Sequence, residues 1–418
     1  MGQIEDWQKL INRNPKTSEK ILLDGWAGLS TDELTAKECS LAVSTAGKIK
    51  SKVLLRMITE DIPENLFNPF IYGAIFTACA NVDDKGLFVD FWDRADKDDL
   101  NSIAISSALF AAGKFYDKEL LKKIWDEVVT LRIDSVIIGA AYTAAALVYS
   151  KAMLRMMWAA SPKESLTSFA YGSAFTAAGG LYDEELVQEI WETLPVKKMT
   201  DAVFGSALSA SGAVRSKKML REIWDQARQS CITDKICGAV ISAAGAVGDR
   251  DLLEYIWHSL PKHNLNNRHF GAIFHAAGLV KSRKILLDAW DKSPKNKLQS
   301  VQLGAAYTAA GEIGDRILLE EFWLGAPDSR QNLVSYASLV KACGKTKSKD
   351  LFIKIYDVIK KKKLFVEMRE IGKLLTCCQI FDLKEMFIEI VGNIRERNLK
   401  LGNAEKIFIE KIAKYFND

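Results

Sequence analysis

Residues 167–195 contain the pattern that decides the fold, TSFAYGSAFTAAGGLYDEELVQEIWETLP. Thr167 and Asp183 carry short oxygen-bearing side chains that can cap the first turn of a helix. Apolar residues follow each of them at the spacing of one helical face. Gly179 lies between the two segments and Pro195 follows the second, and both residue types are common where helices end. The stretch therefore predicts two short antiparallel helices joined by a tight turn.

The same pattern returns every 33 residues, without insertion or deletion, along most of the chain. Its clearest markers are eight tryptophans at the equivalent position of the second helix: Trp92, Trp125, Trp158, Trp191, Trp224, Trp257, Trp290 and Trp323. One hairpin cannot bury its own apolar face, whereas stacked neighbours bury theirs together. We therefore predict an all-α fold, an α-solenoid of about 11–12 helix hairpins, with the tryptophans in its core.

The repeat also predicts the organisation of the chain. We expect one continuous repeat domain over residues 18–399, a degenerate capping helix in 1–17 and a closing helix in 400–418. In each repeat the first helix is called helix A and the second, which carries the tryptophan, helix B. Helix A is expected to end at a left-handed glycine, such as Gly47 or Gly113. A second glycine column inside helix A, such as Gly73 and Gly139, is expected to allow close approach of neighbouring helices.

Composition limits the function classes. The 418 residues are 48% hydrophobic and 26% charged with a net charge of +4, which fits a globular chain and excludes a strongly basic nucleic-acid coat. Seven cysteines without a CxxC pair indicate a reducing compartment rather than a disulfide framework. The N-terminus has no apolar run typical of a signal peptide, and no segment reads as a membrane span. We therefore expect a cytoplasmic protein.

Two repeat families resemble this pattern. GAVGD (residues 245–249) and GEIGD (residues 311–315), each followed by leucines, are similar to HEAT-like repeats of the bilin-lyase type. SAFTAAGGLYDEELVQEIW (residues 173–191) resembles a pentatricopeptide repeat. The first resemblance implies a helical scaffold, and the second implies RNA binding. Fold alone does not choose between these functions.

A column of cations follows the helix B caps and defines the first candidate site, the basic edge. A cation at a helix N-terminus opposes the helix dipole, so helix stability does not explain it. Free N–H groups, a hydroxyl and flanking cations can together bind an anion. The alternative is a solubilising edge whose charge is partly neutralised by the Asp caps. The members are Lys50, Lys52, Lys85, Lys118, Lys151, Arg215, Lys217, Arg250, Lys281, Arg283, Arg316, Lys347 and Lys349.

The second candidate site is a groove along helix A, lined by small polar side chains four residues after the inner glycines. Its members are Thr143, Thr176, Ser209, Ser242, His275, Thr308 and Lys341. The four histidines are spaced so that no pair shares a helical face, which argues against a zinc site. No catalytic motif is found either, so we expect neither an enzyme nor a cofactor. An enzyme acting near His269 and His275 is a further hypothesis that no motif supports.

The leading hypothesis is therefore a non-enzymatic scaffold that binds a protein partner along its extended surface. The alternative is an RNA- or phosphate-binding solenoid that uses the basic edge. These hypotheses differ in their expected salt dependence, because phosphate contacts weaken steeply with salt.

Overall fold

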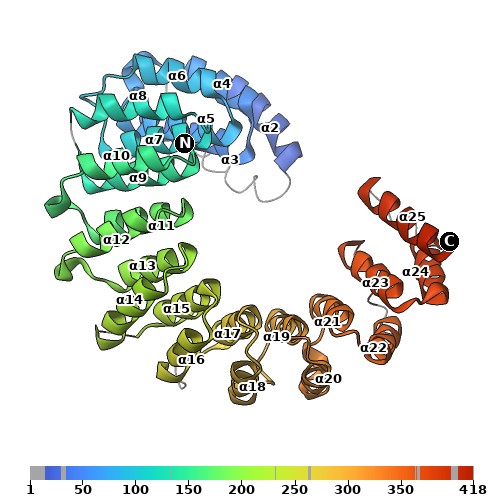
Figure 1. Cartoon of the computed structure of the whole chain (residues 1–418). Coiled ribbons are helices and arrows are strands. Elements are labelled where there is room, and N and C mark those ends of the chain that lie inside the picture. Colours follow the sequence, from blue (N-terminus) through green and yellow to red (C-terminus); the bar gives the residue numbers. More distant parts are fainter. Residues whose placement is uncertain are drawn as a thin grey trace. The chain divides into compact units, whose positions relative to one another are not determined.

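The computed structural model describes residues 15–29, 34–131, 133–230, 232–261, 265–362, 364, 368–396 and 403–417. These residues form helices, turns and connecting segments, and none of them is in a strand. Contacts divide the chain into two compact units, Met1–Ala210 and Ser211–Asp418, and each is described by itself. Each unit is a row of stacked helix hairpins with helices A in one layer and helices B in the other (Figure 1). The prediction of an all-α solenoid is confirmed.

Unit 1 begins with α2 (Pro15–Ala27), a helix B, and continues as complete hairpins. Its helices A are α3 (Ala36–Ile49), α5 (Pro69–Val82), α7 (Ser102–Lys114), α9 (Ser135–Leu147) and α11 (Ser168–Gly180). Its further helices B are α4 (Lys52–Asp61), α6 (Lys85–Arg94), α8 (Lys118–Val129), α10 (Lys151–Ala160) and α12 (Glu184–Thr193). The next helix A, α13 (Asp201–Ala213), runs across the boundary of the units.

Unit 2 has the same alternation. Its helices A are α15 (Asp234–Val247), α17 (Asn267–Leu279), α19 (Ser300–Ile313), α21 (Leu333–Thr346) and α23 (Met368–Phe381). Its helices B are α14 (Lys217–Ser230), α16 (Arg250–Ser259), α18 (Arg283–Lys292), α20 (Arg316–Gly325), α22 (Lys349–Lys361) and α24 (Lys384–Glu396). A last helix, α25 (Asn403–Asn417), contacts α23.

The ends of the chain leave part of the predicted organisation open. The N-terminal capping helix in 1–17 falls largely outside the described residues, and α2 begins at Pro15, three residues before the predicted start of the repeat domain at residue 18. The single repeat domain and the capping roles of both ends stay predictions. Among the helices in the described ranges, none is both long and apolar enough to cross a membrane.

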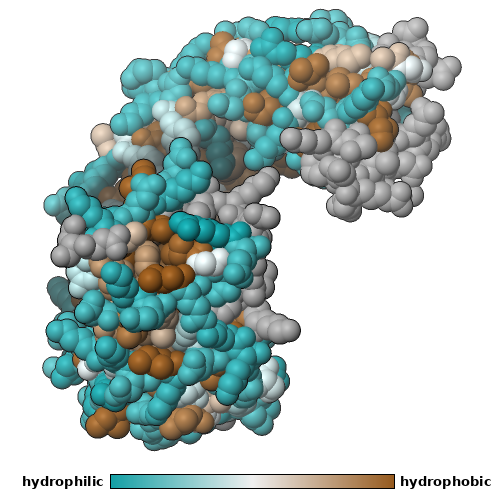
Figure 2. Space-filling view, turned by 90° about the vertical axis from the view of Figure 1, so that its right-hand side faces the viewer, coloured by the Kyte–Doolittle hydropathy of each residue, from teal (hydrophilic) through white to brown (hydrophobic). Residues whose placement is uncertain are grey.

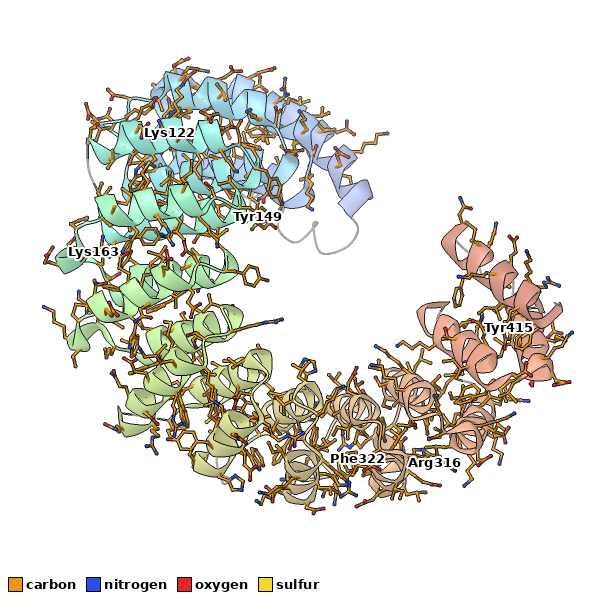
Figure 3. All side chains as sticks on the ribbon, viewed as in Figure 1. Lys122, Tyr149, Lys163, Arg316, Phe322 and Tyr415 are labelled. Carbon is orange, nitrogen blue, oxygen red and sulfur yellow. The ribbon has the colours of Figure 1, made fainter. Side chains whose placement is uncertain are left out.

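The predicted caps start the helices as expected. The Asn101 side chain accepts a hydrogen bond from the Ala104 amide at 2.9 Å, and the Asp117 carboxylate accepts one from the Leu120 amide at 3.0 Å. Each bond satisfies a backbone donor that has no partner within its helix. Short 3-10 turns connect several helices B to the next helix A, and two of them, Lys163–Ser165 and Val196–Lys198, contain a lysine. In one of them, Lys163 lies 4.2 Å from the centre of the Trp158 ring and closes the turn (Figure 3).

The tryptophans form the core that links one repeat to the next. Seven of the eight are buried, and Trp323 is half-buried because Phe322 beside it takes the core position and stacks on Trp290 at 4.3 Å (Figure 3). Several indole N–H groups donate to a carboxylate of the following repeat, such as Trp158 to Glu189 at 2.8 Å. Each such indole contributes apolar burial and one satisfied polar contact across the repeat interface.

The glycines that were expected to end helix A lie inside it instead. An added Cβ on Gly113 would lie 2.9 Å from the Cα of Ala144 in the next helix A, and one on Gly179 would lie 2.8 Å from the Cα of Ala210. The same contact recurs at Gly47, Gly212, Gly245, Gly278 and Gly311. The prediction of a left-handed residue at this column was therefore wrong. The missing Cβ is needed because the next helix occupies its space.

The left-handed residue comes three positions later, directly before the helix B cap, and is seldom glycine. Only Gly248 and Gly314 fill it with glycine. The other members have side chains and φ between 50° and 58°: Lys50, Asp83, Tyr116, Tyr149, Tyr182, Arg215, Lys281, Lys347 and, before the cap of α24, Asp382. The inner glycine column is also less tight than expected, since Gly205 has no atom within 4 Å of an added Cβ.

The two glycine environments predict opposite effects of the same substitution. Gly113→Ala should lower the free energy of unfolding by about 1–3 kcal/mol, because the new methyl group overpacks the contact with Ala144. Gly205→Ala, the matched control in open space, should raise it by up to about 1 kcal/mol through better helix propensity. Thermal and urea unfolding of both variants measure the difference. An increase in stability for Gly113→Ala would contradict the close-contact role.

Candidate functional site

The basic edge is built from cations that bridge successive repeats. In four repeats the first residue of helix B pairs with the Asp cap of the next helix B, 32 residues further on. Lys52 lies 3.4 Å from Asp84, and Arg283 lies 2.7 Å from Asp315. Lys85 with Asp117 and Lys217 with Asp249 form the equivalent pairs. These cations therefore neutralise the neighbouring cap and tie one repeat to the next.

The remaining members of the basic edge have other surroundings. Lys151 donates to the Tyr182 carbonyl at 2.9 Å and Arg250 to the Lys281 carbonyl at 3.1 Å, whereas Arg316 lies 3.3 Å from Asp350 (Figure 3). Six side chains are exposed and make no ion pair with any residue in the described part of the chain: Lys50, Lys118, Arg215, Lys281, Lys347 and Lys349. About half of the cations of the basic edge are thus engaged in contacts within the protein. Anion binding at this edge stays a prediction.

Two buried Asp caps are held by an arginine on the preceding helix B. The Arg56 guanidinium donates to both oxygens of Asp84, at 2.6 and 3.0 Å, and Arg155 binds Asp183 in the same bidentate way. The hydrogen bond from Arg56 lowers the pKa of the Asp84 carboxyl, and the hydrogen bond from Arg155 lowers the pKa of the Asp183 carboxyl. Both carboxylates therefore stay ionised in the folded chain at pH values where they would protonate in the unfolded chain.

The lowered pKa values predict acid sensitivity of unit 1. The unfolded chain binds protons more readily than the folded chain, so this stabilisation is present above about pH 4 and is lost as the pH falls through the lowered pKa values. We expect the midpoint temperature of thermal unfolding to decrease as the pH is lowered below about 4. The decrease should be less steep in the Asp84→Asn, Asp183→Asn double variant. The exposed Asp98→Asn variant is the control. An unchanged slope in the double variant would argue against this role of the Asp caps.

The seven residues predicted to line helix A occupy equivalent positions, nine residues after each helix A cap. Six of them are exposed and Thr308 is half-buried. The threonine hydroxyls donate to the inner glycine carbonyls one turn earlier, Thr143 to Gly139 at 2.9 Å and Thr308 to Gly304 at 2.8 Å. Their oxygen lone pairs remain available as acceptors. The Thr143 and Thr176 hydroxyls thus present acceptors on the surface of unit 1, and the Thr308 hydroxyl presents one in unit 2.

An exposed apolar column lies beside these hydroxyls and was not predicted. It occupies the second residue after six of the helix A caps: Phe70, Ile103, Val136 and Phe169 in unit 1, and Val301 and Val334 in unit 2. Phe70 and Phe169 are 66% and 63% exposed. On the molecular surface, apolar residues appear as separate patches within a largely hydrophilic area (Figure 2). The 33-residue recurrence of this column was readable from the sequence, but an apolar residue in an amphipathic helix is normally assigned to the core.

In each helix A from α3 to α21, the residues at positions two, nine and thirteen after the cap lie on one helical face, which is here named the A face. Its charged side chains are almost all cations: Lys37, Lys48, Lys114, Lys235, Arg268, Lys341 and Lys345, joined by His275. Glu312 is the one carboxylate among the described residues of the A face, and it accepts a hydrogen bond from Lys345. The A face therefore combines apolar side chains, hydroxyls and positive charge.

Two cavities open beside the A face of unit 2. One of about 380 Å³ lies between α21 and α23 and is lined by Lys341, Lys345, Lys373, Thr376 and Ile380, among others. The other, of about 800 Å³, lies at the N-termini of α17 and α19, where Asn266, Arg268 and Gln299 line it. The first cavity carries three lysines and no carboxylate. Its chemistry suits an anionic group attached to an apolar body.

His269 and the thiols of Cys79 and Cys377 lie buried in the core. His269 accepts from the Asn266 amide at 3.0 Å and lies 2.8 Å from the Asp234 carbonyl, so both of its ring nitrogens are engaged. Across the described ranges, no group of His, Cys, Asp or Glu residues could hold a metal ion. Burial raises the pKa of the Cys79 and Cys377 thiols to about 12, which disfavours the reactive thiolate.

No protein-family model matches the sequence, and no curated protein matches it. Among solved structures, the pentatricopeptide repeat protein PPR10 from maize is similar at 12% identity and a TM-score of 0.47, over 96% of this chain and 64% of that one. PPR10 in complex with an 18-nt PSAJ RNA element is similar at 9% identity and a TM-score of 0.44, over 99% of this chain and 66% of that one. Yeast Rmd9p in complex with a 16-nt target RNA is similar at 11% identity and a TM-score of 0.48, over 91% of this chain and 95% of that one. The HEAT-like resemblance stays a prediction.

Proposed function

We propose that the protein is a non-catalytic binding protein for single-stranded RNA, and that the A face of each unit is the contact surface. The observation that carries the proposal is the composition of this face. Exposed apolar side chains recur in four successive repeats of unit 1, cations occur on helices A of both units, and Glu312 is the one carboxylate among the described residues of the face. The basic edge is a weaker candidate, because about half of its cations already bridge repeats or cap carbonyl groups.

The apolar column supports base binding. Phe70, Ile103, Val136 and Phe169 are exposed in four successive repeats, so an extended ligand along unit 1 would meet one apolar side chain at each step. Nucleic-acid bases present apolar faces once they are unstacked, and single-stranded regions leave those faces accessible. A duplex would hide them, and this argues for a single strand.

The hydroxyl column supports RNA over DNA. The hydroxyl protons of Thr143 and Thr308 are already donated to the Gly139 and Gly304 carbonyls. Their oxygens can therefore accept from a ligand but are poorly placed to donate to it. An RNA 2′-hydroxyl is a donor that DNA lacks, and contacts to it distinguish the two polymers.

Charge supports the same ligand class. Lys235, Arg268 and Lys341 are exposed on the A face of unit 2 and make no ion pair with the residues that the structure describes. They can therefore neutralise phosphates without first breaking an internal contact. Phosphate contacts of this kind are strongly salt-dependent.

The test is the binding of a labelled single-stranded RNA pool by fluorescence anisotropy at several salt concentrations. We expect the dissociation constant to rise steeply with salt. The Lys235→Ala, Arg268→Ala, Lys341→Ala variant should bind more weakly and lower the slope of log affinity against log salt by about 2, at about 0.7 per phosphate contact. A single-stranded DNA pool should bind more weakly than RNA.

The matched control removes three cations of the basic edge, in the variant Lys52→Ala, Lys85→Ala, Lys217→Ala. It has the same change in net charge, and we expect it to retain most of the affinity. If the edge variant lost affinity while the A-face variant kept it, the contact surface would be wrong. If the unmodified protein showed no salt-dependent RNA binding, the proposal would fail, and a protein partner on the apolar column would become the better explanation.

A further inference from the structure

Three consecutive repeats of unit 1 carry an exposed tyrosine at the same backbone position. Tyr116, Tyr149 and Tyr182 are 65%, 75% and 70% exposed and lie in the turns between helix A and helix B. Figure 3 shows Tyr149 at the end of α9, on the opposite side of the helix layer from Lys163. Large exposed aromatic side chains at one register in three successive repeats form a regular array, here named the tyrosine ladder.

The backbone at these positions is unfavourable for tyrosine. The three residues have φ of 54°, 52° and 55°, in the left-handed region that a bulky side chain rarely adopts. In unit 2 two of these turns are made by glycine, at Gly248 and Gly314, and three by a long cationic residue, at Arg215, Lys281 and Lys347. The turn geometry therefore does not require an aromatic residue and is easier to form without one.

Packing does not account for the tyrosines either. None of the three rings contacts another aromatic ring or a cation of the described residues, and none of their hydroxyls makes a hydrogen bond there. Their backbone amides do close the turn, as from Tyr149 to the Ala146 carbonyl at 3.1 Å, but any residue except proline would supply that donor. Within the described part of the chain, the three side chains therefore make no observed hydrogen bond or ring contact.

We propose that the tyrosine ladder is a stacking platform on which three successive bases of a single strand rest. The inference depends on the proposed RNA-binding function and adds a subsite to it, at the opposite end of helix A from the apolar column. Exposed rings with unused faces are suited to stacking with bases of any sequence. Lys114 and Lys118 are exposed and lie two residues to either side of Tyr116, so cations for the phosphates accompany the first ring.

The left-handed backbone provides a test in which binding and stability change in opposite directions. In the variant Tyr116→Gly, Tyr149→Gly, Tyr182→Gly, glycine removes the rings and also relieves the unfavourable φ. We expect the affinity for the labelled single-stranded RNA pool to fall by about fivefold for each tyrosine removed. The midpoint of thermal unfolding should stay unchanged or rise, which excludes misfolding as the cause of weaker binding.

Two control variants define the role of the rings. The Tyr116→Phe, Tyr149→Phe, Tyr182→Phe variant keeps the rings without their hydroxyls and should bind within about twofold of the unmodified protein, because stacking uses the ring face. Asp83→Gly makes the same backbone change at the equivalent turn of an earlier repeat and should not weaken binding.

The outcomes separate this inference from the function on which it rests. If the unmodified protein binds RNA and the triple glycine variant binds equally well, the ladder is wrong and the A face alone carries binding. If the phenylalanine variant loses as much affinity as the glycine variant, the contact is made by the hydroxyls and stacking is overturned. If the unmodified protein does not bind the RNA pool, the proposed function itself fails.

Discussion

The close contact between successive helices A is the constraint on which the rest of the structure depends. Where an alanine backbone lies 2.6–2.9 Å from the position of a missing Cβ, no residue other than glycine fits without displacing the neighbouring helix. Since the contact recurs in most repeats, each hairpin must meet the next in the same register. An inserted residue would move the glycine away from its alanine, and this accounts for the strict 33-residue period.

In the helix B layer, hydrogen bonds and ion pairs between neighbouring repeats maintain the same register. Buried indoles donate to side chains one repeat further on, and the first cation of several helices B reaches the next Asp cap. Because each of these interactions joins one repeat to the next along the chain, the stability of each unit is built from contacts between neighbouring repeats. They also use much of the charge on helix B, so the basic edge is less available to a ligand than its sequence indicates.

Function is consequently expected where packing leaves side chains without an internal role. The A face exposes apolar residues and hydroxyls in successive repeats, and the turns of unit 1 expose three tyrosines on an unfavourable backbone. A regular array of unused groups suits a ligand that is itself a repeating polymer. This regularity, together with the near absence of carboxylates from the described A face, is the physical basis for proposing a single-stranded nucleic acid rather than a compact ligand.

The sequence by itself determined the secondary structure, the repeat and the core. The N-caps, the periodic apolar residues and the tryptophan column are local signals whose physical effect does not depend on distant residues, so the hairpins followed from them. The tertiary structure alone decided which residues remain exposed and which cations are paired. Gly113 had the local features of a helix end, but the space for its Cβ is taken by Ala144, which lies 31 residues away. Phe70 likewise had the features of a core residue. Its exposure depends on how the neighbouring helices are oriented, and that orientation is set by contacts between repeats, which no single stretch of sequence contains.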